Sequence, residues 1–191
     1  MATQAERVAA SDRALIDAAI ELIAERGYDR TTLALIGERA GYSRGLVTQR
    51  FGNKENLLWA VIRQILDRWN TNAFQPRVAT QVGVPALQTL LAAYLDACET
   101  GPTRIRAYYA LLREADGPVS EVRETIRKLH VNERASIASL VQHYEGIDPD
   151  AFATEFLGVM RGVTMQWLWD PKVDLVGTLT QYGVSLERTL H

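Results

Sequence analysis

Cysteine is almost missing from this chain, because Cys98 is the single one among 191 residues. One thiol cannot form a disulfide within the chain and cannot assemble a cysteine-based metal site. We therefore expect Cys98 to be a buried free thiol. A histidine site is no better supported, because His130 and His143 face different sides of the long helix expected around them. Both are expected to be solvated, and no metal or cofactor is predicted.

Long apolar runs are also missing. No stretch approaches the roughly 20 apolar residues that span a bilayer, and residues 1–10 lack the apolar centre of a secretory signal peptide. With 47% apolar and 23% charged residues, the composition is that of a folded globular protein. We expect it in the cytoplasm. Its length permits one ordinary domain or a small module joined to a larger one.

Strand patterns and enzyme motifs are absent as well. No run alternates β-branched and polar residues, whereas apolar positions recur at helical spacing almost throughout. The sequence therefore predicts an all-α fold. It contains no glycine-rich phosphate loop after a strand, no Gly-x-Ser-x-Gly elbow and no His-Glu-x-x-His run. We therefore expect a protein that is not an enzyme.

An excess of positive charge is the last missing feature, since the formal net charge is −2. The distribution is uneven, however. Between Arg30 and Lys54 five basic residues accompany one acid, Glu38, which gives 5 − 1 = +4. From Pro76 onward 11 basic and 14 acidic residues give −3. Because Lys and Arg neutralise phosphates, a local basic patch on an acidic chain indicates either a confined DNA-binding surface or a merely solvated face.

Capping residues and glycines mark four helices in the first third of the chain. We expect these helices to begin after Ser11 or Asp12, after Thr31 or Thr32, after Ser43 and after Asn53. Gly27 and Gly41 would end the first two, and the third would run through Phe51 with Val47 and Phe51 on its buried side. The fourth, about 54–74, carries an apolar stripe and is the natural connection to the rest of the chain.

The remainder of the chain predicts further helices. Residues 75–85 form the clearest linker, and helices are expected at about 85–99, 104–115, 120–144, 148–169 and 173–190. The last two carry apolar stripes, made of Phe152, Phe156, Met160, Val163 and Trp167, and then of Leu175, Leu179, Tyr182 and Leu186. Two such helices can complete the core or pair with another subunit.

Three short helices with a glycine in the turn between the second and third are typical of a helix-turn-helix, whose third helix lies in the major groove. The expected base contacts come from Arg44, Leu46 and Gln49. The expected phosphate contacts come from Thr31, Thr32, Ser43, Thr48, Arg50 and Lys54. Gly45 would let backbone and DNA approach closely. Tyr42 is either a phosphate ligand or a packing residue.

The stretch from Gly27 to Val61 resembles the DNA-binding domain of the tetracycline-repressor family. The resemblance rests on five blocks: Gly27-Tyr28, Thr31-Thr32, Ile36-Gly37, Ala40-Gly41-Tyr42-Ser43-Arg44-Gly45 and Phe51-Gly52-Asn53-Lys54-Glu55-Asn56-Leu57. The family commonly has Tyr, a variable residue and then His or Tyr before the Phe, where this chain has Thr48, Gln49 and Arg50. Thr48 and Arg50 can still bind phosphate, but the operator cannot be inferred from other members.

The resemblance implies a division of labour along the chain. Residues 1–56 would form the helix-turn-helix domain, and residues 75–191 a helical domain that binds a small molecule and forms a homodimer through its last two helices. The implied function is a repressor that a small-molecule effector releases from double-stranded operator DNA, with the fourth helix transmitting the change. The alternatives are a DNA-binding regulator without such an effector, and an all-α enzyme.

Aromatic and sulfur side chains are the candidates for the effector site. They are Tyr94, Cys98, Tyr108, Tyr109, Phe156, Met160, Trp167 and Trp169, together with Arg113. At helical spacing each of the apolar ones can equally be a core residue. Arg113 needs a partner on a mostly apolar face, and Glu114, Asp116 or an anionic ligand would provide one.

Overall fold

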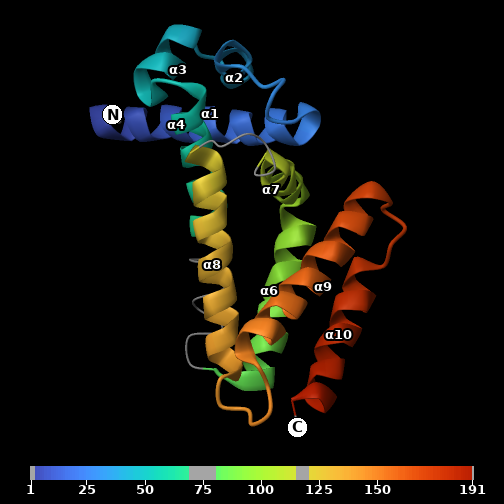
Figure 1. Ribbon diagram of the computed structural model, residues 1–191. Helices are drawn as coiled ribbons and strands as arrows, with labels where there is room; N and C mark the ends of the chain where they lie inside the picture. Colours follow the sequence, from blue (N-terminus) through green and yellow to red (C-terminus); the bar gives the residue numbers. More distant parts are fainter. Residues whose placement is uncertain (1–2, 69–80, 115–120, 191) are drawn as a thin grey trace. The chain divides into compact units, whose positions relative to one another are not determined.

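The computed structural model describes residues 3–68, 81–114 and 121–190, and the statements below concern these residues (Figure 1). They form α-helices and no strand, which confirms the predicted all-α fold. The helices are α1 (Gln4–Arg26), α2 (Leu33–Ala40), α3 (Arg44–Phe51), α4 (Lys54–Arg68), α6 (Gly83–Thr100), α7 (Pro102–Glu114), α8 (Glu121–Val141), α9 (Pro149–Trp169) and α10 (Leu175–Thr189).

The chain divides into two compact units. The first unit contains residues 1–68 and 101–124, and the second contains residues 69–100 and 125–191. Helix α7 therefore packs with the N-terminal helices, although it follows α6 directly in the sequence. The expected functional division into residues 1–56 and 75–191 stays a prediction, because packing alone does not say which residues bind DNA or an effector.

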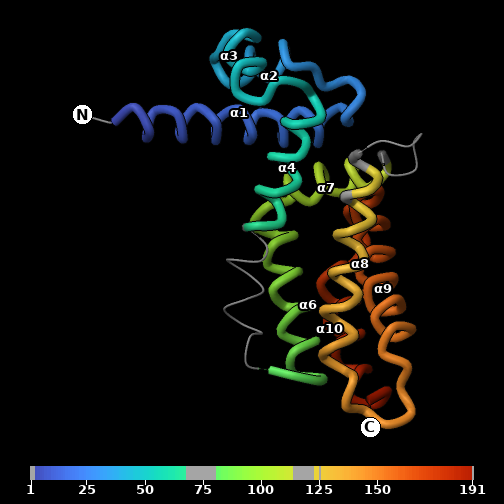
Figure 2. Tube along the Cα trace, turned by 60° about the vertical axis from the view of Figure 1, so that its left-hand side comes forward, coloured from blue at the N-terminus to red at the C-terminus, as the bar shows by residue number. Residues whose placement is uncertain are grey.

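In the first unit, α1 is the central element. Helices α2, α4 and α7 all pack against it, and Figure 2 shows α2 and α3 lying along one side of α1. Its buried face carries Leu15, Ala19, Leu22 and Ile23 at helical spacing. Val47 is the fully buried residue that α3 contributes to this core. The position of α3 is thus fixed through the apolar interior.

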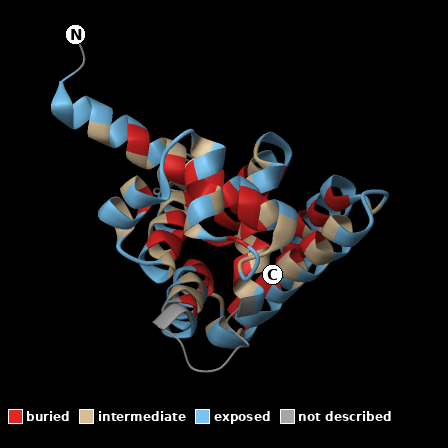
Figure 3. Cartoon of the chain, turned by 90° about the horizontal axis from the view of Figure 1, so that it is seen from above, coloured by how far each residue is buried: buried red, intermediate tan, exposed pale blue. Residues whose placement is uncertain are grey.

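Helix α1 begins at Gln4, so the expected start at Ser11 or Asp12 is wrong. Thr3 forms a capping box, in which its hydroxyl accepts from the Glu6 N–H and the Glu6 carboxylate accepts from the Thr3 N–H. Ser11 lies inside the helix, where its hydroxyl donates to the Val8 carbonyl at 2.8 Å. The turns before Ser11 are largely exposed (Figure 3).

The other helix starts in the first third agree with the sequence. Thr32 caps α2 and Ser43 caps α3, and Asn53 accepts from the Asn56 N–H at 2.8 Å at the start of α4. Helix α6 begins at Gly83, two residues before the predicted start, and α8 ends at Val141, three residues before the predicted end. Residues 75–80 of the predicted linker lie outside the described residues, and its last three residues, 83–85, belong to α6.

In the second unit, α10 packs against both α6 and α9, and Figure 1 shows α9 and α10 as a pair of neighbouring helices. Phe156, Leu179 and Leu186 are buried, as their stripes predicted. Val163, Trp167 and Tyr182 are only half-buried. Across α6 and α9, the hydroxyls of Tyr94 and Thr164 are 2.8 Å apart and share a buried hydrogen bond.

Candidate nucleic-acid interface

The turn between α2 and α3 depends on two glycines. Gly41 ends α2 in the left-handed region, with φ +77°, which favours glycine. Gly37 lies inside α2, where an added Cβ would stand 2.7 Å from the Tyr42 carbonyl oxygen. A larger residue at Gly37 would therefore push the turn away from α2. The sequence signal was the small residue after Ile36, but we did not predict this role.

Helix α3 has a protein-facing side and a solvent-facing side. Ser43 caps it by accepting from the Leu46 N–H at 3.2 Å. Val47 is fully buried and Phe51 is half-buried, as predicted. The exposed residues on the outward side are Ser43, Arg44, Gly45, Thr48 and Gln49. The solvent-facing side of the helix thus carries polar side chains and, at Gly45, no side chain.

The predicted base-contacting residues differ in accessibility. Arg44 and Gln49 are exposed, whereas Leu46 is half-buried. The Arg44 side chain forms no hydrogen bond or ion pair with any residue that the structure describes. An added Cβ at Gly45 would meet the Ser43 Oγ at 3.6 Å, an ordinary contact. The packing of the described chain therefore does not require glycine at position 45.

Among the predicted phosphate-contacting residues, Thr31 differs from the others in its burial. Thr31 is only 1% exposed, and its hydroxyl donates to the Gly27 carbonyl at 2.8 Å. It therefore helps to close the end of α1 and does not present a hydroxyl to phosphate. Thr32, Ser43 and Thr48 are exposed. Tyr42 is exposed as well, so its side chain can contact either solvent or DNA. The spacing of apolar residues in the sequence could not show that Thr31 is buried while Thr32 is exposed.

Lys54 is held in place by the loop after α1. Its Nζ donates to the Asp29 carbonyl at 3.2 Å and lies 3.9 Å from the centroid of the Tyr28 ring. The Gly27-Tyr28 block and the Lys54 block are distant in sequence, and the structure brings them together. The ammonium group is therefore positioned before any ligand arrives.

Two arginines of the basic patch are paired with acids on α1. Both Nη atoms of Arg39 donate to Glu25 at 2.8 Å, and Glu21 accepts at 3.2 Å. The hydrogen bonds to Glu25 and Glu21 raise the pKa of Arg39. Arg50 Nε lies 3.4 Å from the Asp12 Oδ1. The count over residues 30–54 missed these pairs because their acids lie on α1.

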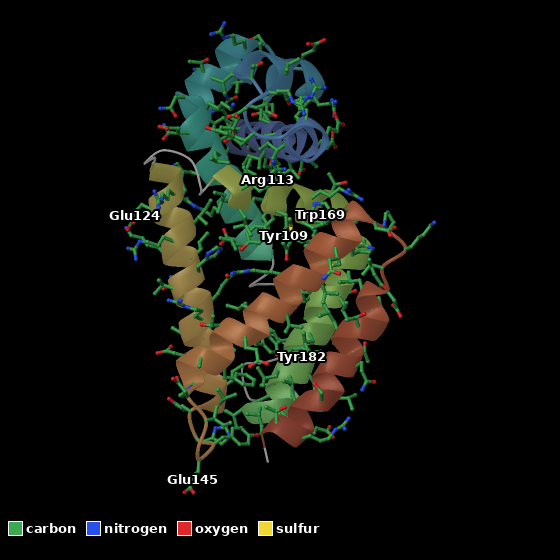
Figure 4. All side chains as sticks on the ribbon, turned by 45° about the vertical axis from the view of Figure 1, so that its right-hand side comes forward. Tyr109, Arg113, Glu124, Glu145, Trp169 and Tyr182 are labelled. Carbon is green, nitrogen blue, oxygen red and sulfur yellow. The ribbon has the colours of Figure 1, made fainter. Side chains whose placement is uncertain are left out.

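The effector-site candidates are distributed over both units. In the second unit Tyr94, Cys98, Phe156 and Met160 are buried and Trp167 is half-buried. Cys98 is 1% exposed and free, which confirms the prediction of a buried free thiol. This burial raises the pKa of the thiol to about 12. Trp169, at the end of α9, is 75% exposed (Figure 4). Thr164, which we did not single out, joins the set through Tyr94.

The remaining candidates lie on α7 in the first unit. Tyr109 is buried and Tyr108 half-buried, and their rings meet edge to face at 5.8 Å. Arg113 lies one turn beyond Tyr109 and is exposed (Figure 4). Of its proposed partners, Asp116 and the side chain of Glu114 lie outside the described residues. The role of Arg113 therefore stays a prediction.

His130 is half-buried, whereas the sequence predicted a solvated side chain. Its Nε2 is buried without a hydrogen-bond partner among the described residues. Burial, and then the charges of Arg161 and Arg134, lower the pKa of His130 to about 4. Arg161 itself pairs with Glu133 across α8 and α9. His143 is exposed and lies beyond the end of α8, beside Tyr144.

The described part of the chain offers no cluster of three His, Cys, Asp or Glu side chains suited to a metal ion. None of its helices is long and apolar enough to cross a membrane.

Comparison with known proteins gives one consistent result. The family model for bacterial regulatory proteins of the tetR family matches residues 15–61. The HTH-type transcriptional regulator BetI of Burkholderia thailandensis is 32% identical over 143 residues, which are 74% of this chain and 71% of the relative. The residues matched by the family model include all of α2 and α3.

Solved structures agree on the fold over nearly the full length. A transcriptional regulator from Rhodococcus sp. has a TM-score of 0.82 at 17% identity, covering 94% of this chain and 95% of its own. A regulator from Saccharomonospora viridis in complex with choline has a TM-score of 0.81 at 17% identity, covering 95% and 98%. These structures show the shared fold, and the sequence matches show that the chain belongs to the TetR family of bacterial transcriptional regulators.

Proposed function

We propose that the protein is a homodimeric repressor that reads operator DNA with α3 and is released from it by a small-molecule effector. The observation that supports DNA reading is the two-sided α3, in which Val47 is buried while Arg44 and Gln49 are exposed. Arginine can grip a guanine bidentately and glutamine an adenine, and the methyl groups of Leu46 suit a thymine methyl. Arg44 is therefore the principal candidate for base recognition.

The surrounding polar groups suit the DNA backbone. The N-termini of α2 and α3 are capped by Thr32 and Ser43, and free N–H groups in a first helical turn attract phosphates. Thr48 is exposed one turn after Arg44, and Lys54 is held by Asp29 and Tyr28. Such contacts fix the register of α3 in the groove without reading sequence.

Dimerisation is proposed through α9 and α10. Gly158 and Gly162 lie one turn apart on the exposed side of α9, and a Cβ at either would meet no atom within 4 Å. Glycine inside a helix costs roughly 0.5–1 kcal/mol relative to alanine, so contacts outside the single chain would explain their presence. Val176 and Val184 on α10 are also exposed. A two-fold dimer would place two α3 helices in successive major grooves, roughly 34–36 Å apart.

The effector is proposed to bind among the aromatic residues of the second unit. Tyr94, Phe156 and Met160 are buried apolar side chains that would contact such a ligand, and the Tyr94 and Thr164 hydroxyls would provide polar groups. An effector that binds better to a second arrangement of the dimer lowers its DNA affinity by population shift. Helices α4 and α7 are the proposed carriers of this change, because both pack with α1 in the first unit.

The test of DNA binding is selection from a random duplex library, followed by gel-shift assays with the selected sequence. We expect enrichment of a palindrome, and Arg44→Ala should weaken its binding by about 1–3 kcal/mol and relax the preference at one base pair of each half-site. Arg106→Ala, which removes an exposed arginine from α7, should bind as the wild type does. Failure to enrich any sequence would contradict the proposal.

The effector test is a thermal-shift screen that begins with choline, because the Saccharomonospora viridis regulator contains it. An effector should raise the melting temperature and weaken binding to the selected palindrome together. A DNA-binding regulator without an effector would bind the palindrome but respond to no compound in a broad screen.

A further inference from the structure

We propose that Asp12 on α1 is a positioning residue for DNA binding, which holds the Arg50 guanidinium so that its terminal nitrogens face a phosphate. The inference rests on the proposed DNA-binding function and assigns a role to a residue on α1. It starts from an ion pair between Asp12 Oδ1 and Arg50 Nε, 3.4 Å apart.

The two atoms that form the ion pair are shielded from solvent, although the side chains that carry them are partly exposed. Both Asp12 Oδ1 and Arg50 Nε are shielded from solvent and have no hydrogen-bond partner among the described residues. The whole side chains nevertheless keep 37% and 27% of their exposure. The accessible part of Arg50 must therefore lie away from Nε, toward the terminal Nη atoms. A guanidinium is planar, so holding Nε restricts the direction of both Nη donors.

The position of Arg50 on α3 places its guanidinium near the surface proposed to contact DNA. Arg50 lies in the last turn of α3, three residues after buried Val47 and two after exposed Thr48. It stands at the border between the protein-facing and outward sides. A free arginine loses rotamer freedom when it binds phosphate, whereas an arginine already held by Asp12 loses less.

The opposite reading is that Asp12 occupies Arg50 and keeps it from DNA. The negative charge of Asp12 would then only repel phosphates, and removing it would strengthen DNA binding. The number of phosphates neutralised distinguishes the two, because on duplex DNA the slope of log K against log salt changes by about 0.9 for each phosphate that the protein neutralises. A duplex of random sequence is sufficient as the probe, since the binding of phosphates does not depend on sequence.

The experiment measures the affinity of the full chain for a random 30-base-pair duplex over a range of salt concentrations. We expect Arg50→Gln to reduce the magnitude of the slope by about 0.9 per subunit. Asp12→Asn should weaken binding roughly 2–10-fold per subunit without making the slope steeper, because Arg50 remains but must be ordered on binding. The double variant should match Arg50→Gln. The control is Glu21→Gln, which removes an acid of α1 that pairs with Arg39 and should keep the wild-type slope. Unchanged or tighter binding, or a steeper slope, for Asp12→Asn overturns the role of Asp12, whereas absence of wild-type binding overturns the DNA-binding function itself.

A second measurement avoids dependence on a folded variant. In the free wild-type protein, nitrogen-15 relaxation of side-chain Nε–H groups should show Arg50 to be more ordered than Arg44, and its Hε should exchange more slowly with water. Equal mobility of the two side chains would overturn the proposal.

Discussion

Asp17 on α1 and Arg104 on α7 are joined by an ion pair, with Arg104 Nη2 3.2 Å from Asp17 Oδ1. The same oxygen accepts from Gln64 Nε2 of α4 at 2.9 Å. Three helices of the first unit thus meet at one carboxylate oxygen. This oxygen ties the two proposed signal carriers, α4 and α7, to the helix on which α2 and α3 rest.

The strength of this ion pair can be measured by a double-mutant cycle. Both side chains are partly exposed, at 47% and 33%, so solvent screens their attraction. We expect Arg104→Ala to lower the free energy of unfolding by about 1 kcal/mol, with a coupling to Asp17→Asn of about 0.5–1 kcal/mol. Denaturant unfolding gives both values. The control Arg106→Ala should change stability by less than about 0.5 kcal/mol, and strictly additive effects would show that the pair contributes nothing.

Two glycines of the helix-turn-helix should respond oppositely to alanine. Gly37→Ala brings a Cβ to 2.7 Å from the Tyr42 carbonyl, so we expect a decrease of about 1–3 kcal/mol in unfolding free energy. Gly45→Ala has room and adds helix propensity, so stability should stay equal or rise by up to about 1 kcal/mol. Its DNA affinity should nevertheless fall if the backbone approaches DNA there. Thermal unfolding and gel-shift assays on both variants test this, and a stable Gly37→Ala protein would contradict the expected clash.

His130 should make the protein acid-sensitive. Its pKa is lowered to about 4 in the folded state, whereas an unfolded histidine titrates near 6.5. The unfolded chain therefore binds a proton first as the pH falls. The stability from neutral His130 is complete above pH 6.5 and is lost progressively between pH 6.5 and 4.

The comparison uses melting temperature against pH. His130→Gln should lose less stability over this window than the wild type, because it has no imidazole to protonate. His143→Gln, at an exposed position, should follow the wild-type curve. Parallel curves for wild type and His130→Gln would mean that His130 titrates normally.

The proposed dimer can be tested on α9. Gly162→Arg places a long charged side chain where the single chain leaves open space, so each subunit should still fold. If this surface forms the dimer interface, it would not accommodate the arginine side chain. Sedimentation should then show a monomer, and a gel-shift assay should show weak operator binding. Glu145→Arg, at an exposed turn (Figure 4), should remain a dimer. A dimeric Gly162→Arg protein would place the interface elsewhere.

Helices and their caps were predictable because they depend on local spacing. Ser43 and Asn53 were identified as caps from the residue type and the apolar residues that follow. The start of α1 was missed because its first turns are exposed and carry no apolar stripe, so only the Thr3 and Glu6 capping box marks it. Residues close in sequence thus determined what could be foreseen.

Interactions between distant segments were not predictable. The pairing of Arg39 with Glu21 and Glu25, and of Arg50 with Asp12, depends on how α2 and α3 lie against α1. Composition could count these charges but could not show which of them are paired. The burial of His130 likewise depends on tertiary packing, which the spacing of residues within one helix does not contain.

Because residues 101–124 belong to the first unit, they matter when the N-terminal segment, residues 1–68 (the head), is exchanged between family members. Ile105, Ala107, Tyr109 and Leu111 are the buried residues of α7, and a transplanted head that ended at Arg68 would leave its α1 without this cover. A chimaera that combines this chain's α7 with the α1 of another protein would also lose the ion pair between Arg104 and Asp17. Functional grafts should therefore carry α7 together with the head, as two segments taken from the same parent.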